Sequence, residues 1–158
     1  MSTFHRTGTS IVVACVGSAH GDDQAAWRLA EMLREHADET FHVVAVDSPI
    51  EIIDQLRGCG KLIVVDACRS GGEVGRVTRL RCPNRRIVKR HSHSTHGIGV
   101  SQALRLAERL GRLPPVVEVF GIEIANCSPG SEISSAVLQA VVDLEAVISY
   151  ETRGVLHA

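Results

Sequence analysis

Two adjacent carboxylates, Asp22 and Asp23, lie where an apolar stretch ends in a glycine-rich turn, in "VGSAHGDDQ". A third carboxylate, Asp66, directly follows the apolar run "KLIVV", and three histidines lie close together in "HSHSTHG". A carboxylate that ends a buried strand needs hydrogen bonds or a cation to offset its desolvation. Two carboxylates and one imidazole from separate loops form a mixed oxygen and nitrogen ligand set, which suits Zn, Ni, Mn or Fe better than Ca or Mg. The residue types therefore favour a small transition-metal site.

Each of these residues also has a purely structural explanation. An aspartate at a helix start is a common cap, which accounts for one of Asp22 and Asp23 but does not require both. Asp47 precedes Ser-Pro and is typical of a turn. A lone histidine is usually structural, but three within six residues favour at least one ligand among them. The three are His91, His93 and His96.

The elements that must position these residues alternate in type along the chain. Short apolar runs predict strands, and apolar residues at helical spacing predict helices. The expected strands are 10–16, 41–46, 61–65 and 114–123, with a weaker extended region over 76–90, and the expected helices are 22–37, 48–56, 100–110 and 133–148. Because parallel strands need long crossover connections, this order predicts an α/β three-layer sandwich with a mostly parallel twisted sheet and helices on both faces. We expect residues 1–158 to form a single domain, with its site beyond the carboxyl ends of the strands.

Overall charge predicts no partner, since 17 basic and 18 acidic residues nearly cancel. The apolar runs are shorter than the roughly 18 to 20 residues of a membrane span, and the N-terminus lacks a signal-peptide core, so we expect a cytoplasmic protein without membrane contact. The segment from Val74 to Ala107 carries eight cations and no acidic residue. Without aromatic residues it does not predict nucleic-acid binding, and it is either a solvated face or a docking surface for an acidic or polar partner segment.

Four motifs in order resemble the hydrogenase maturation endopeptidases along nearly the whole chain. They are "GSAHGDD", "VVDACRSGG", "STHGIGVSQALRLAERLGRLPPVVEVFGIE" and "ISSAVLQAVVDLEAVI". The resemblance implies that Asp23, Asp66 and His96 are both the metal ligands and the catalytic residues. His91 and His93 fall outside the family's ligand position and are neighbours of the site only.

The resemblance also implies an activity, that of an aspartic-type endopeptidase. Its substrate would be the nickel-loaded large-subunit precursor of a [NiFe] hydrogenase, from which it would remove a C-terminal extension. The substrate would bring the nickel, and Zn or Cd could replace it in crystals. The enzyme would act as a monomer.

The chain departs from the family pattern beside the acidic pair. The family's Gly-Asn is Gly17-Ser18 here, and Gln24 and Ala26 replace glycines, so we expect these side chains to narrow the cleft. Asp22 is then a helix cap, with proton transfer as its alternative role. A non-catalytic, chaperone-like module that checks nickel loading is the alternative function. A nucleotide-binding domain is disfavoured because no phosphate-binding loop motif is present and two aspartates would repel phosphate.

Overall fold

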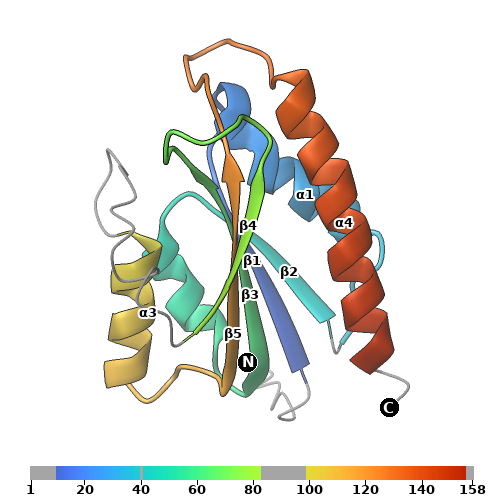
Figure 1. Cartoon of the computed structure of the whole chain (residues 1–158). Helices are drawn as coiled ribbons and strands as arrows, with labels where there is room; N and C mark the ends of the chain where they lie inside the picture. Colours follow the sequence, from blue (N-terminus) through green and yellow to red (C-terminus); the bar gives the residue numbers. More distant parts are fainter. Residues whose placement is uncertain (1–9, 40, 83–98, 156–158) are drawn as a thin grey trace.

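A computed structural model of the protein describes residues 10–39, 41–82 and 99–155. At its centre is a five-stranded sheet with the strand order β2-β1-β3-β5-β4 (Figure 1). The strands are β1 (Ser10–Val16), β2 (Phe41–Val46), β3 (Cys59–Cys68), β4 (Val77–Arg81) and β5 (Val116–Glu123). The first four in the order pair in parallel, and β4 joins β5 antiparallel. The prediction of a mostly parallel sheet is confirmed.

Strand β1 is apolar from Ile11 to Val16 because it lies inside the sheet with both faces covered. All seven of its residues are buried. Val13 and Cys15 belong to the apolar cluster on one face of the sheet, whereas Val12 and Ala14 belong to the cluster on the other. This continuous burial is what distinguishes a central parallel strand from a strand with one face in water.

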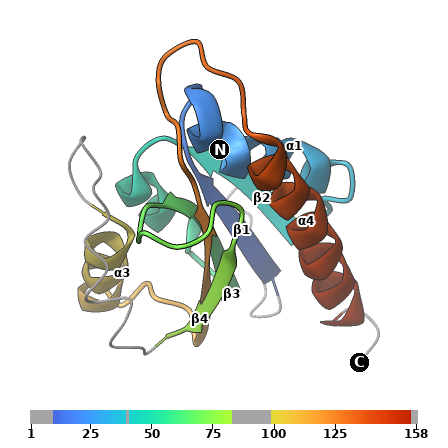
Figure 2. The ribbon, with the colours of Figure 1, turned by 45° about the horizontal axis from the view of Figure 1, so that its top comes forward.

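Helices cover both faces, which confirms the three-layer sandwich (Figures 1 and 2). One face packs against α1 (Ala25–Arg34) and α4 (Ser135–Val155), through residues such as Leu29 and Leu144. The opposite face packs against the 3₁₀ helix η2 (Pro49–Gln55) and α3 (Val100–Arg109), through residues such as Ile52 and Leu104. No helix among the described residues is long and apolar enough to cross a membrane.

Several elements differ from their expected bounds. The helix expected over 22–37 begins with a 3₁₀ turn, η1 (Gly21–Gln24), before α1 starts at Ala25. The helix expected over 48–56 is 3₁₀ and begins with a capping box between Ser48 and Glu51. The strand expected to end at Val65 continues to Cys68, because its last residues still pair with β5.

Strand β4 is an edge strand, as the weaker extended pattern over 76–90 predicts. Only Leu80 among its five residues is buried. The other residues are exposed or half-buried, so one face of the strand meets solvent. The part of the expected extended region after Cys82 lies outside the described residues.

Candidate functional site

The carboxyl ends of the parallel strands form one edge of the sheet, and Asp66 lies there. Val16 pairs with Val46 on one side and with Asp66 on the other, and Asp66 in turn pairs with Gly121. The Asp66 side chain is half-buried, two residues before β3 ends. The predicted position of this carboxylate at the edge is therefore confirmed, although the strand does not stop at it.

The loop after β1 folds back so that Asp23 returns to the end of the strand. The backbone N–H of Gly17 donates to the Val46 carbonyl at 3.0 Å, and that of Ser18 donates to the Asp23 carbonyl at 3.1 Å. A Cβ atom on Gly17 would collide with the same Asp23 carbonyl. Glycine is thus required at position 17 by the close approach of two backbone segments. Because Gly17 directly follows Val16, the fold brings Asp23 to the edge that holds Asp66.

Asp22 has a different role from its neighbour. Its side chain is completely buried, and its two carboxylate oxygens accept three backbone N–H groups from the segment between β5 and α4. Oδ2 accepts from Ala125 at 3.0 Å and from Asn126 at 3.1 Å, and Oδ1 accepts from Ser134 at 2.7 Å. The expectation that Asp22 caps the helix it precedes is wrong. It instead ties the β1–η1 loop to a segment more than 100 residues away in the chain.

These three hydrogen bonds also fix the charge of Asp22. Burial raises the pKa of this carboxyl, but the hydrogen bonds from Ser134, Ala125 and Asn126 outweigh burial and leave the pKa below its usual value. Both oxygens are engaged by donors, so the side chain is poorly suited to carry a proton. The arrangement contradicts proton transfer as the role of Asp22 and favours structural support.

Gly21 completes the contact between the two segments. It has a positive φ of 52°, and a Cβ atom there would collide with the Asn126 carbonyl and the Ser131 hydroxyl. The N–H of Asp22 donates to that Asn126 carbonyl at 2.7 Å. The "GSAHGDD" turn is therefore held by its backbone as well as by the Asp22 carboxylate.

Glu123 supports the second loop of the site in the same way, and the sequence reasoning missed it. This buried carboxylate at the end of β5 accepts N–H groups from three successive residues after β3. The donors are Ser70 at 2.8 Å, Gly71 at 3.1 Å and Gly72 at 3.2 Å. Burial raises the pKa of Glu123, but hydrogen bonds from the hydroxyl and N–H of Ser70, the Cys68 thiol and the Gly72 N–H outweigh burial and lower it. The argument applied to Asp66, a carboxylate at the end of a buried strand, would have found this residue.

The end of β5 therefore supports both loops that carry candidate ligands. Glu123 holds the loop that follows Asp66, and the adjacent residues Ala125 and Asn126 hold the loop that carries Asp23. Asp23 is half-buried, and within the described ranges its carboxylate makes no hydrogen bond or ion pair. Its oxygens remain available to a ligand.

The third predicted ligand, His96, lies outside the described residues, as do His91 and His93. No group of three or more histidine, cysteine, aspartate or glutamate side chains that could hold a metal ion occurs within 10–39, 41–82 and 99–155. The structure thus places two of the three predicted residues at one edge, and the complete ligand set stays a prediction.

The replacement of a family glycine by Ala26 does not narrow the cleft. Ala26 is completely buried in the apolar cluster between the sheet and α1, so its methyl group faces the core. Gln24 is half-buried and has an ordinary helical φ of −71°, which does not require glycine. The expectation of a narrowed cleft is wrong for Ala26, because the helix turns that side chain away from the site.

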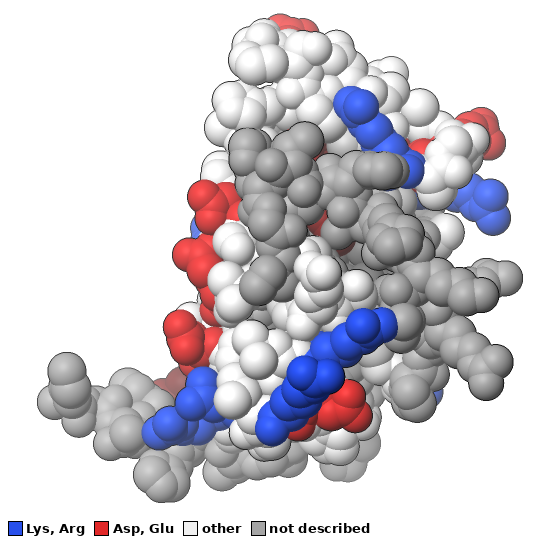
Figure 3. All heavy atoms as spheres, turned by 90° about the vertical axis from the view of Figure 1, so that its left-hand side faces the viewer, with Lys and Arg blue, Asp and Glu red and all other residues white. Residues whose placement is uncertain are grey.

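The basic stretch is partly neutralised by acidic residues from elsewhere in the chain. Arg79 and Arg81 pair with Glu118 of β5. On the α3 side of the molecule, acidic and basic side chains both gather among the atoms that are described (Figure 3). Arg85, Arg86, Lys89 and Arg90 lie outside the described residues.

Several solved structures share the fold. The hydrogenase maturating endopeptidase HybD from E. coli aligns with a TM-score of 0.79 and 18% identity, over 92% of this chain and 93% of that chain. The [NiFe] hydrogenase maturation protease HybD from Thermococcus kodakarensis aligns with a TM-score of 0.71 and 20% identity, over 90% and 99%. The hydrogenase 2 maturation peptidase from a Thaumarchaeota archaeon aligns with a TM-score of 0.67 and 23% identity, over 92% and 99%.

No curated protein matches the sequence. A family model does match it, that of HycI, described as hydrogenase maturation protease, over residues 27–151. The matched range contains Asp66, the position of His96, Glu123 and the loop after β5, and it begins four residues after Asp23. With most of the chain matched and the fold shared, this protein belongs to the hydrogenase maturation protease family.

Proposed function

We propose that this protein removes the C-terminal extension from the large-subunit precursor of a [NiFe] hydrogenase once nickel has been inserted. Family membership supports the reaction class. The observation that carries the proposal for this chain is the placement of Asp23 and Asp66 at the same edge of the sheet, each beside a loop held by a buried carboxylate.

The nickel belongs to the substrate in this proposal. Asp23, Asp66 and His96 would supply two oxygens and one nitrogen, a donor set that suits a borderline divalent cation such as nickel. Three protein ligands leave positions free for groups of the precursor. The enzyme would then engage only precursors that have already been loaded, which makes the metal a recognition element.

The two aspartates would contribute negative charge and would fix the position of the substrate's metal ion. A metal ion held at this edge can polarise the scissile carbonyl or activate a water molecule. The two aspartates would orient that ion, because Gly17 and Asp22 hold the loop of one and Glu123 holds the loop after the other. Asp22 would not relay the proton, because three N–H donors occupy its oxygens.

The direct test mixes the purified protein with a nickel-loaded precursor and follows the mass of the precursor. We expect loss of a C-terminal peptide from the loaded precursor and none from the nickel-free one. Asp23→Asn, Asp66→Asn and His96→Ala should abolish cleavage with the fold intact. Asp54→Asn is the matched control, because its side chain is 84% exposed and lies on η2 rather than on either candidate loop. Normal cleavage by Asp23→Asn would show that the ligand assignment is wrong.

Binding can be read separately from cleavage through Trp27, the one tryptophan of the chain. Its indole N–H donates to the Val46 carbonyl at 3.0 Å, and its ring lies against Gly17, next to the Asp23 loop. We expect a nickel-loaded precursor to change Trp27 fluorescence more than a nickel-free one does. Binding of the loaded precursor without any cleavage would instead support the nickel-checking module.

We further propose that the protein acts as a cytoplasmic monomer. The five cysteines are all free thiols, which is typical of proteins from a reducing compartment. Size-exclusion chromatography with light scattering, at the concentrations used for the cleavage assay, should give the mass of one 17.0 kDa chain.

A further inference from the structure

An open cavity of about 640 Å³ lies between β4 and the C-terminal half of α4, away from the candidate site. Lys61 is near the start of β3, whereas Asp66 lies five residues further along the same strand. At a rise of about 3.3 Å per residue, this separates the two positions by roughly 16 Å. The cavity is therefore a distinct feature at the other end of the sheet.

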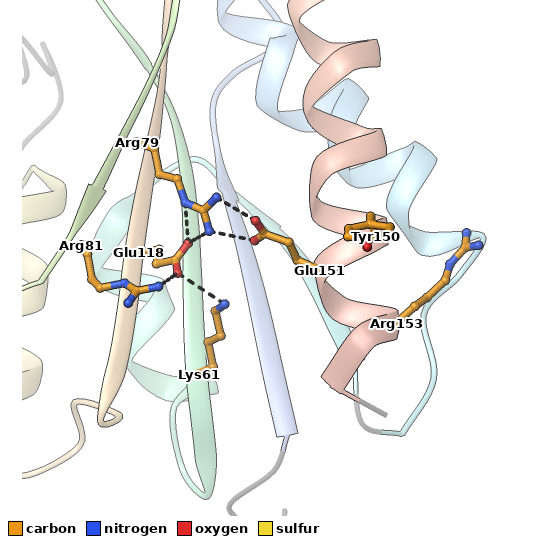
Figure 4. Close-up of a pocket in the computed structure, with 7 residues that line it drawn as sticks. All are labelled: Lys61, Arg79, Arg81, Glu118, Tyr150, Glu151 and Arg153. Atoms are coloured by element: carbon orange, nitrogen blue, oxygen red, sulfur yellow. Dashed lines mark hydrogen bonds and ion pairs between the residues drawn. The ribbon is translucent and has the colours of Figure 1, made fainter. Parts of the chain in front are cut away.

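A buried carboxylate organises the cations of this cavity. Glu118 of β5 is completely buried, and Lys61, Arg79 and Arg81 all point toward it (Figure 4). Arg81 donates to its Oε1 at 2.9 Å, and the Lys61 ammonium lies 3.4 Å from the same oxygen. Arg79 donates to its Oε2 through Nε at 3.0 Å and Nη2 at 2.7 Å. The three cations are held in place before any ligand arrives.

Arg79 is fully engaged inside this network. Besides Glu118, it donates to both carboxylate oxygens of Glu151 on α4, at 2.7 and 2.8 Å. Its guanidinium also lies over the Phe120 ring, 5.1 Å from the centroid. Arg79 therefore links the sheet edge to α4 and has little capacity left for another anion.

Arg81 and Lys61 retain donors that face the cavity. Arg81 uses only Nη2 for Glu118, and its side chain is 72% exposed. Its Nε and Nη1 donate to no other side chain among the described residues, and the Lys61 ammonium forms its ion pair there with Glu118. Arg153 and the 81% exposed Tyr150 complete the rim on α4. Four cations and two carboxylates line the cavity, so its charge is +2.

We propose that this cavity is a docking site for an acidic polypeptide segment, an exosite through which the precursor is recognised away from the cleavage centre. Arg81 and Lys61 supply the charge complementarity, since guanidinium and ammonium groups pair well with carboxylates. A cavity of this volume accommodates a short peptide stretch. Identification of the segment with the precursor rests on the proposed function, but the acidic peptide site itself does not.

The first experiment measures binding without cleavage. Fluorescein-labelled octaglutamate is titrated with the full-length protein at about 50 mM salt, and the anisotropy is followed. We expect saturable binding that weakens with added salt, because exposed ion pairs are screened. Arg81→Gln should weaken binding about tenfold, whereas Arg81→Lys should retain most of it. Arg109→Gln, which removes an exposed cation on α3, is the matched control and should bind like the wild type.

The same titration contains the results that would overturn the proposal. They are no binding of octaglutamate, equal weakening by Arg109→Gln, or tighter binding of a single-stranded DNA octamer than of octaglutamate. Should Arg81→Gln fail to fold, Lys61→Gln tests the same site, because the Lys61 side chain lines the cavity and points toward Glu118 (Figure 4).

The second experiment uses the precursor. Arg81→Gln should raise KM for cleavage severalfold and leave kcat unchanged, because the cavity lies apart from the cleavage centre. An unchanged KM would refute the exosite for this substrate. If the wild type cleaves no precursor at all, the proposed function fails, while the octaglutamate titration still decides whether the acidic peptide site exists.

Discussion

Replacing Asp22 by Asn tests whether the two adjacent aspartates have the separate roles assigned to them. The carboxylate of Asp22 accepts one N–H on Oδ1 and two on Oδ2. An asparagine side chain of the same shape offers one oxygen and one NH₂ group, so at least one backbone N–H must face another donor. The change removes charge and hydrogen bonds but leaves the volume of the side chain nearly constant.

The expected loss of stability follows from those contacts. A buried N–H without a partner costs about 1–3 kcal/mol, and hydrogen bonds to a charged acceptor are worth more than neutral ones. We therefore expect Asp22→Asn to lower the free energy of unfolding by about 2–4 kcal/mol. For a chain of 158 residues this corresponds to a decrease in Tm of roughly 4–16 °C. A domain with a typical stability of about 5–15 kcal/mol stays folded at 25 °C.

The functional consequence should be separable from unfolding. At 25 °C, folded Asp22→Asn should bind nickel-loaded precursor more weakly through a displaced Asp23 loop, and cleave it more slowly. Thermal unfolding by circular dichroism gives the stability, and precursor mass gives the cleavage rate, with Asp54→Asn as the control for a neutralised aspartate. A Tm within about 1 °C of the wild type would refute the reasoning, because the three hydrogen bonds would then contribute nothing.

Three further predictions concern the same framework. The pKa values of Asp22, Glu118 and Glu123 are all lowered in the folded protein. These carboxylates therefore stabilise the fold above their unfolded pKa values near 4, and this stabilisation is lost as the pH falls below those values. Tm should stay nearly level from pH 7 to 5 and fall steeply below about pH 4, and a level profile down to pH 3 would contradict the prediction. Gly17→Ala should displace the Asp23 carbonyl that the new Cβ would strike. It should abolish cleavage and lower Tm less than Asp22→Asn does, whereas full cleavage would show that the loop adapts. Ala26→Gly should restore the family residue without increasing cleavage, because the Ala26 methyl group is buried in the core. It should lower the free energy of unfolding by about 1 kcal/mol or more, because glycine weakens a helix. Faster cleavage would show that the methyl group does obstruct the substrate.

Much of the fold could be predicted from local patterns. The expected bounds of β1 and β2 agree with the structure, because short runs rich in valine and other apolar residues mark both strands. The amphipathic spacing over 100–110 marks α3, and the partial alternation after residue 76 marks the edge strand β4. Each of these signals depends only on residues within one element.

The start of α1 was less predictable. An acidic pair followed by an apolar periodicity suggests a continuous helix, but Gly21–Gln24 form a 3₁₀ turn that carries Asp22 into contact with the segment before α4. The residues that donate to Asp22 lie more than 100 positions away in the chain, so no local sequence pattern predicts the contact.

The sequence by itself determined the α/β architecture, the family and the presence of Asp23 and Asp66 at the carboxyl edge of the sheet. Only the tertiary structure decided which of the two adjacent aspartates is a support and which remains open to a ligand. The physical reason is that two neighbouring carboxylates have the same chemistry until the fold surrounds one of them with donors. Asp22 receives three N–H groups and is removed from solvent, whereas Asp23, one residue later, is half-buried and its backbone carbonyl bonds to Ser18 at the end of β1.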